Sequence, residues 1–149
     1  MKLSTKGRYG LRCMIDLAIH SRGEKVSLCA IAERQNISEN YLEQVFASLR
    51  KAGLVKSIKG AQGGYILAQD PGKVSVGRVL RALEGNLSII DIPDTAEDGG
   101  TVSIQRTIKT HLWDVIDESI NRLVDGITLQ DLVEDYEKAR HGDNIMYHI

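Results

Sequence analysis

Residues 38–51 of the chain have the sequence SENYLEQVFASLRK, and residues 59–65 have the sequence KGAQGGY. In the first stretch, apolar residues recur at the i, i+3, i+4, i+7 spacing of an amphipathic helix, at Leu42, Val45, Phe46 and Leu49. Ser38 is a good N-cap for this helix, because its hydroxyl can accept a hydrogen bond from a first-turn backbone N–H. We expect the helix to bury its apolar side and to present its polar side to a partner.

Another short helix precedes this one at close range. It is predicted to begin at the N-cap Ser27, and residues 35–37 connect it to Ser38. Two short helices joined by a tight turn, the second with an outward polar face, are typical of a helix-turn-helix. An amphipathic helix starting near Ser4 or Thr5 comes before both of them.

The second quoted stretch is predicted to form the tip of a β-hairpin. Residues 54–58 and 65–68 have the composition of two short strands, and the glycines between them permit the backbone angles of a hairpin tip. A hairpin directly after a helix-turn-helix is a wing, and a short helix from the N-cap Ser75 to Leu83 follows it. The predicted fold class is mainly α with a small β-hairpin wing.

Charge is divided unevenly along the chain. Residues 1–84 contain 14 lysines and arginines against 7 acidic residues, whereas residues 85–149 contain 5 against 13, for a net charge of −1. A basic half suggests a polyanionic partner for that half. Together with the winged helix-turn-helix pattern, it predicts binding to double-stranded DNA.

The predicted DNA contacts come from the helix after Ser38, from the wing and from the start of the chain. The amide and carboxylate side chains of that helix match base edges in the major groove, while basic residues contact phosphates and the wing tip enters the minor groove. The candidate DNA-binding residues are Thr5, Lys6, Ser38, Asn40, Tyr41, Glu43, Gln44, Arg50, Lys56, Lys59, Gln62 and Gly63.

Other function classes find little support in the sequence. The four histidines are scattered and no phosphate-binding loop precedes a helix, so we do not predict an enzyme. No apolar run would span a bilayer and no signal peptide is evident, so we expect a cytoplasmic protein. Cys13 and Cys29 are the only cysteines, and we expect both to be buried small side chains rather than a disulfide or a metal site.

The C-terminal part is predicted to contain a long helix from about Thr101 to Val124. Its apolar stripe is longer than a small winged domain can cover, which favours a partner helix from a second subunit. Packing back onto its own domain is the alternative. We therefore predict three segments: a DNA-binding domain over residues 1–84, a loop over 85–100, and a dimerisation helix and tail over 101–149. The candidate dimerisation residues are Ile104, Ile108, Leu112, Val115, Ile116, Ile120 and Leu123.

Several motifs resemble the Rrf-two family of regulators, the IscR/CymR class. The resemblance is carried by MKLSTKGRYG at residues 1–10, ISENYLEQ at 37–44 and KGAQGGY at 59–65, and it extends over nearly the whole chain. It implies a homodimer that binds a partly palindromic operator with one winged domain per half-site. It also implies that the long helix crosses its twin.

Many members of that family sense iron–sulfur clusters, iron, nitric oxide or redox state through three cysteines and a further ligand. Counted back from Trp113, the later ligand positions fall here on Thr101, Thr107 and Thr110, and the earliest falls near Ile92 or Thr95. Threonine cannot supply thiolate sulfur, so we predict no cofactor in this sequence. Natural loss of the ligands and their replacement by engineering both account for the threonines.

The end of the chain suggests a further partner. After a short acidic helix near Tyr136, the tail ends in Met146-Tyr147-His148-Ile149, which is similar to tails of the cysteine-metabolism branch of the family. In that branch, a bound cysteine synthase transmits the signal. Tyr147 and Ile149 are therefore candidate partner contacts, and a frayed or self-docked tail is the alternative. We predict a repressor of iron–sulfur cluster assembly or of cysteine and sulfur metabolism genes. An adaptor acting through the tail on a cysteine synthase is the competing function.

Overall fold

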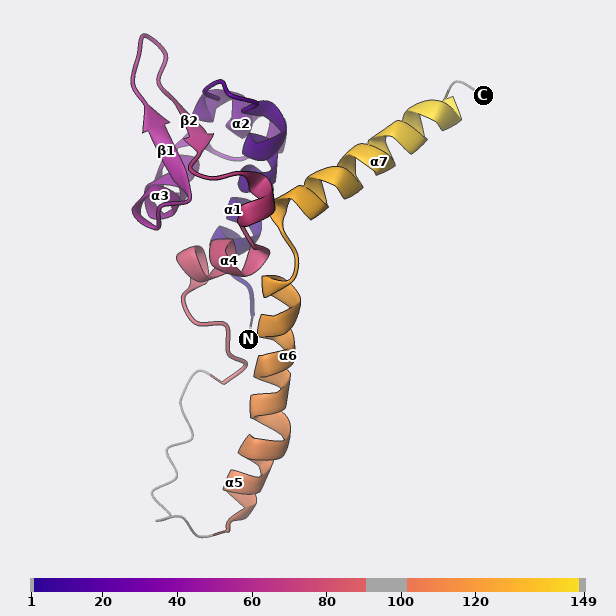
Figure 1. The fold of residues 1–149 in the computed structure, drawn as a ribbon. Coiled ribbons are helices and arrows are strands. Elements are labelled where there is room, and N and C mark those ends of the chain that lie inside the picture. Colours follow the sequence, from indigo (N-terminus) through magenta and orange to yellow (C-terminus); the bar gives the residue numbers. More distant parts are fainter. Residues whose placement is uncertain (1, 91–101, 148–149) are drawn as a thin grey trace.

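The N-terminal part of the molecule is a winged helix-turn-helix, as the sequence predicts (Figure 1). The structure, a computed structural model, describes residues 2–90 and 102–147, with side chains described as far as residue 143. The elements of this part are α1 (Thr5–His20), α2 (Leu28–Gln35), α3 (Glu39–Lys51), β1 (Val55–Ile58), β2 (Gly64–Leu67), the 3-10 turn η1 (Pro71–Lys73) and α4 (Val76–Glu84).

The first four helices begin where a serine can cap them. The hydroxyl of each serine accepts a hydrogen bond from the backbone N–H three residues further on, at Ser4, Ser27, Ser38 and Ser75. α2 ends at Asn36, whose left-handed φ of 54° stops the helix and directs the chain into α3. These signals are local in the sequence, which explains why all four starts could be predicted.

The wing is a two-stranded antiparallel hairpin in which Val55 lies opposite Leu67 and Ile58 opposite Gly64. Compared with the predicted ranges, β1 begins one residue later and β2 is displaced by one residue toward the N-terminus. The prediction that the tip glycines supply special backbone angles is wrong, because none of Gly60, Gly63 and Gly64 has a positive φ.

Gly64 is required for a different reason. Tyr65 forms an isolated β-bridge with Val26, so the loop before α2 lies directly against β2. A Cβ atom at Gly64 would lie only 2.8 Å from the carbonyl oxygen of Val26. The glycine therefore allows close approach of two backbones.

Besides a smaller cluster around Val76, Leu80 and Leu87, one main hydrophobic core joins the winged part to the last helix. Its fully buried side chains include Met14, Leu17, Ile31, Leu42, Val45, Phe46 and Leu49. Leu129, the first residue of the last helix, is equally buried in this core, and Thr128 forms a β-bridge with Ser75. The predicted division at residues 84 and 100 stays a prediction, but the segment after residue 125 contributes to the same core.

The two cysteines have different surroundings. Cys13 is buried in α1, as expected, whereas Cys29 is exposed near the start of α2. The expectation of two buried thiols is therefore wrong for Cys29. Burial raises the pKa of the Cys13 thiol to about 12, and the neighbouring Asp16 carboxylate acts in the same direction. Cys13 is consequently an unreactive core side chain.

The predicted long helix is present as one continuous helical stretch (Figure 1). It consists of α5 (Ile104–Ile108), the π-turn η2 (Lys109–Trp113) and α6 (Asp114–Asp125). The N-cap of α5 is Ser103, whose hydroxyl accepts from the backbone N–H of Arg106. In Figure 1 this stretch extends well beyond the winged part, and only its α6 end lies beside α4.

The last helix, α7 (Leu129–Tyr147), differs from the prediction. It starts as expected, with Thr128 and Asp131 each accepting a hydrogen bond from the other's backbone N–H. It is 19 residues long instead of short, so the tail predicted to begin at His141 is helical as far as residue 147. Within residues 2–90 and 102–147, no helix combines the length and apolarity needed to cross a membrane.

Candidate nucleic-acid interface

The outward face of α3 carries the side chains predicted to contact bases. Leu42, Val45, Phe46 and Leu49 are buried against the core, and Asn40, Glu43 and Gln44 are exposed on the opposite side. Figure 1 shows α3 beside the β1–β2 hairpin and away from α6 and α7. Amide and carboxylate groups are thus presented on a protruding helix of a winged fold, which is the arrangement that enters a major groove.

Two predicted α3 contacts also serve the fold. Ser38 caps the helix by accepting from the backbone N–H of Tyr41. Tyr41 is half-buried, and its ring meets the edge of Tyr9 with centroids 6.2 Å apart. The guanidinium of Arg12 lies 5.1 Å from the Tyr9 ring centroid. The Tyr41 ring is therefore oriented by α1, whereas Asn40, Glu43 and Gln44 are oriented by the helix alone.

The start of α1 lies close to α3. The ammonium of Lys6 donates to Ser48 Oγ at 2.9 Å, which ties Lys6 to the α3 helix. Thr5, the first residue of α1, is exposed, and its hydroxyl accepts a weak bond from Arg8 at 3.5 Å. The structure thus brings Thr5 and Lys6 to the edge of the α3 surface, although one donor of Lys6 is already engaged.

The wing adds exposed basic and polar residues to the same surface. Arg50 at the end of α3 is exposed, and so are the predicted wing residues Lys56, Lys59, Gln62 and Gly63. Lys25, which was not predicted, also lies at the wing. A Cβ atom added to Gly60 would be only 2.6 Å from the ammonium nitrogen of Lys25, so this nitrogen lies against the tip of the hairpin. Lys25 lies in the loop between α1 and α2, where no periodic pattern marks it, so only its charge could have indicated it.

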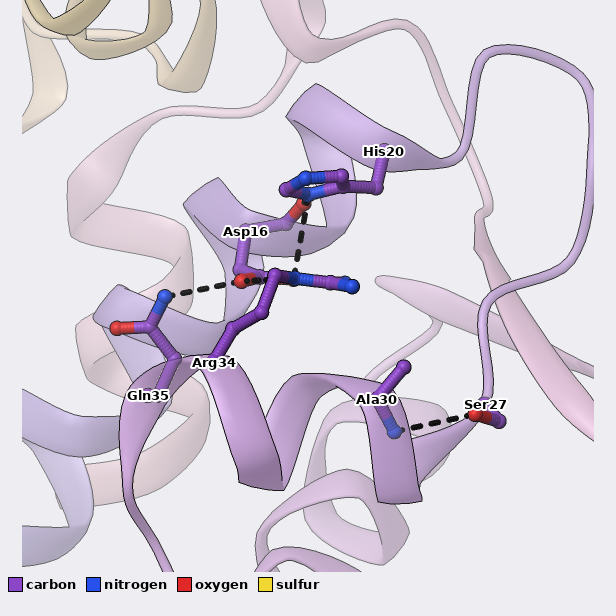
Figure 2. Close-up of polar contacts among 6 residues, drawn as sticks. All are labelled: Asp16, His20, Ser27, Ala30, Arg34 and Gln35. Carbon is purple, nitrogen blue, oxygen red and sulfur yellow. Dashed lines mark hydrogen bonds and ion pairs between the residues drawn. The ribbon is translucent and has the colours of Figure 1, made fainter.

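A buried ionic network holds the helix-turn-helix to α1 (Figure 2). The Asp16 carboxylate, with a side chain only 1% exposed, accepts from Arg34 at 2.7 Å and from Gln35 at 2.9 Å. His20 Nδ1 lies 3.5 Å from the same carboxylate. Burial opposes ionisation of Asp16, but the hydrogen bonds from Arg34 and Gln35 outweigh it, so the pKa of Asp16 lies below its ordinary value. Asp16 therefore fixes the C-terminal end of α2 on α1.

A second polar network connects the winged part to α6. Arg81 on α4 donates to Asp125 at 2.6 Å and to Asn121 at 2.5 Å, and the hydrogen bond from Arg81 lowers the pKa of Asp125. Asn121 also donates to the carbonyl oxygen of Leu87 at 3.1 Å. Asp117 accepts at 2.7 Å from Ser88, near the start of the predicted loop. One face of α6 is thus fixed to the winged part by directional contacts.

The other face of the long helix is apolar and exposed. The exposed fraction is 81% at Ile104 and 63% at Leu123, and the remaining exposed members of the predicted set are Ile108, Leu112 and Val115. Ile116 and Ile120 are half-buried instead. The structure therefore separates the predicted dimerisation set into five exposed and two half-buried residues. We call the five exposed residues the apolar stripe.

The described members of the predicted ligand positions carry hydroxyl groups and no thiolates. Thr107 directs its hydroxyl to the carbonyl oxygen of Ser103 at 2.8 Å, and Thr110 is exposed on the π-turn. Ile92 and Thr101 lie outside the described residues. In the part of the chain that the structure describes, no group of three or more His, Cys, Asp or Glu side chains could hold a metal. Hydroxyl and aliphatic groups cannot replace cysteine thiolates as iron–sulfur ligands.

The side chains of the predicted tail contacts, Tyr147 and Ile149, also lie outside the described residues. The backbone of residue 147 ends α7, far from the α3 surface in Figure 1. The tail therefore stays a prediction from the sequence.

Comparison with known proteins places residues 3–135 in the Rrf2 family model, described as an iron-dependent transcriptional regulator. The HTH-type transcriptional regulator CymR of Bacillus subtilis (strain 168) is 43% identical over 132 residues, covering 89% of each chain. The HTH-type transcriptional regulator IscR of Vibrio atlanticus (strain LGP32) is 41% identical over 144 residues, covering 96% of this chain and 81% of the relative.

Solved structures give the same result. The structure of CymR (YrzC), the global cysteine regulator of B. subtilis, matches with a TM-score of 0.76 at 42% identity, covering 90% of this chain and 97% of that one. T. potens IscR matches with a TM-score of 0.73 at 47% identity, covering 93% of this chain and 90% of that one. These relatives are transcriptional regulators and not enzymes, and none of their names supports the adaptor alternative.

Proposed function

This chain belongs to the Rrf2 family of transcriptional regulators, and we propose that it binds a partly palindromic operator as a homodimer in the cytoplasm. DNA binding is the activity of the family, and the proposal concerns how this chain performs it. The observation that carries it is the exposed polar face of α3, held between α1 and the wing.

Base contacts are assigned to the exposed α3 side chains. Gln44 and Asn40 each present an amide that can bond adenine in a bidentate manner, and Glu43 can accept from cytosine. The exposed basic residues of α3 and the wing, with Lys25, are assigned to phosphates, which set affinity and its dependence on salt. Thr5, Lys6 and Ser38 would contact the backbone at the edge of this surface.

The apolar stripe supports the homodimer. Five large aliphatic side chains exposed along one face of one helix are unusual for a stable monomer, and a twin helix would cover them. A two-fold dimer places two α3 helices in successive major grooves, which explains a palindromic operator.

We assign repression without a cluster as the mode of regulation. The absence of a cluster is supported by the hydroxyl side chains at the described ligand positions, Thr107 and Thr110. Because CymR is a global cysteine regulator by its description, cysteine and sulfur metabolism is one regulated pathway that the similarity suggests, and iron–sulfur cluster assembly is the other. We also propose that Tyr147 and Ile149 contact a cysteine synthase. Deletion of Ile149 should then abolish synthase binding. Unchanged synthase binding after that deletion argues against it.

The test is a fluorescence-anisotropy titration of the iron-free protein with the palindromic region of its own promoter. A shuffled duplex of equal length is the control, and two salt concentrations are compared. We expect selective binding that weakens steeply as salt rises. Equal affinity for both duplexes would contradict the proposal.

The variant Gln44→Ala sharpens this test, because it removes one amide predicted to contact a base. We expect about tenfold weaker binding to the promoter and little change with the shuffled duplex. Gln130→Ala on α7 is the matched control and should bind like the parent protein. Parent-like affinity of the Gln44 variant would remove Gln44 from the interface.

A further inference from the structure

A cavity of about 630 Å³ opens between α1, the end of α2 and the first turns of α7. Its volume lies within the range of small-molecule sites, which is about 300–1,000 Å³. Neither the DNA-binding surface nor the apolar stripe includes its lining residues. The α1 wall is formed by residues that share one helix face, and the α7 wall comes from positions four residues apart.

One side of the cavity is apolar. Ile15 and Ile19 of α1 face Leu132 and Tyr136 of α7 across it. Tyr136 is 49% exposed, so much of its ring is available for contact. These four side chains can take up a flat hydrocarbon or aromatic body of modest size.

The polar side of the cavity has an excess of positive charge. Arg12, Arg34 and Arg140 line it, and among the lining residues that the structure describes Asp16 is the one acidic residue. The Asp16 carboxylate is already bonded by Arg34 and Gln35. Its charge is therefore matched by Arg34, which leaves Arg12 and Arg140 without an acidic partner among the described residues of the cavity.

These two arginines are held differently. Arg12 donates to the backbone carbonyl oxygen of Gln35 at 2.6 Å and from Nε to Gln35 Oε1 at 3.4 Å, so its guanidinium is held at the end of α2, while its Nη1 group forms no hydrogen bond with a residue that the structure describes. Arg140 forms no hydrogen bond or ion pair with any other residue that the structure describes. A guanidinium binds a carboxylate through two parallel hydrogen bonds, and a cation beside an apolar wall selects an anion with an apolar body.

We propose that this cavity binds a small organic carboxylate with an apolar body. The carboxylate lies against Arg140 and Arg12, and the apolar body packs between Leu132, Tyr136 and the isoleucines of α1. Such a ligand spans α1 and α7, and it lies next to the Asp16–Arg34 contact that holds α2. The binding reaction does not require DNA, so it is tested separately from the proposed function.

The experiment compares 2-naphthoate with its neutral analogue 2-naphthamide on the full-length protein. Binding is followed by ¹H–¹⁵N NMR of the arginine side chains and backbone amides. For a probe of this size we expect a Kd on the order of 1 mM for naphthoate. The amide, which lacks the charge, should bind about tenfold more weakly.

The variant Arg140→Gln locates the site. We expect it to weaken naphthoate binding about tenfold and to leave naphthamide binding unchanged. Arg122→Gln on α6 is the matched control, because Arg122 is exposed, lies outside the cavity and pairs with Glu118. Equal binding of the acid and the amide, equal effects of the two variants, or perturbed signals confined to α5 and α6 would each overturn the proposal.

Discussion

The winged part and the long helix place similar aliphatic and aromatic residues in opposite surroundings. In the winged part the side chains of Phe46, Leu42 and Leu49 are fully buried, whereas on the long helix Ile104 is 81% and Leu123 63% exposed. Both regions have helical apolar periodicity in the sequence. Periodicity therefore indicates that a face will be covered, but not whether the cover comes from the same chain.

The largest expected effect on the free energy of unfolding comes from a substitution in the buried core of the winged part. Phe46→Ala removes an aromatic ring from the centre of the core and should lower the free energy of unfolding by about 3–5 kcal/mol. Chemical denaturation measures it. The control Val102→Ala changes a side chain that is 95% exposed, and it should cost less than about 0.5 kcal/mol. A similar loss of unfolding free energy in both variants would contradict the burial of Phe46.

A charge on the exposed side should separate the subunits. Leu112→Asp places a carboxylate in the middle of the apolar stripe, where a twin helix would have to desolvate it. We expect the dimer dissociation constant to rise about 100-fold, equivalent to roughly 3 kcal/mol. Analytical ultracentrifugation measures the change, and Thr110→Asp, an exposed position on the same helix, is the control. A parent protein that is monomeric at micromolar concentration would contradict the dimer.

The buried ion pair gives a smaller effect that depends on pH. Asp16→Asn should lower the free energy of unfolding by about 1–3 kcal/mol at pH 7, because Arg34 loses its ionic partner. The pKa of Asp16 is lowered in the folded protein, and in the unfolded chain it is about 3.9. The stabilisation is therefore complete above about pH 4 and is lost as the pH falls through the folded-state pKa.

Denaturation curves of parent and Asn variant from pH 3 to pH 7 test this dependence. The gap between the two proteins should narrow as the pH falls below about 4. A gap that is constant over the whole range would show that the ionised carboxylate is not the stabilising form.

The smallest perturbation is chemical labelling, which compares a buried and an exposed cysteine within the winged part. Iodoacetamide at pH 8 should modify Cys29 and leave Cys13 intact in the folded protein, because Cys29 is exposed and the pKa of Cys13 is about 12. Peptide mass spectrometry distinguishes the two sites, and labelling in denaturant, where both should react, is the control. Rapid native labelling of Cys13 would refute its burial.

Sequence reasoning predicted those parts of the fold that have local signals. The serine caps and apolar spacing located α1 to α4, and the strands were located to within one residue. It failed where signals were weak or non-local. The length of α7 was missed because its last turns lack an apolar stripe, and the role of Gly64 depends on Val26, 38 positions away in the chain.

In the candidate interface, too, residues with local signals were predicted and residues placed by distant contacts were missed. The polar face of α3 follows from helical periodicity, so Asn40, Glu43 and Gln44 were identified correctly as exposed residues. Lys25 was missed because its place beside the wing depends on how the loop after α1 folds. That Tyr41 packs against Tyr9 was likewise beyond reach, since the two rings meet only when α1 and α3 cross.

By itself the sequence determined the winged helix-turn-helix, the family and the presence of threonine at the predicted ligand positions, because each depends on residue type at a known spacing. Only the tertiary structure decided which face of the long helix is fixed to the winged part and which is exposed. It also decided that three arginines from three helices line one cavity with an apolar wall. Such arrangements depend on contacts between distant segments, which the order of residues along the chain does not specify locally.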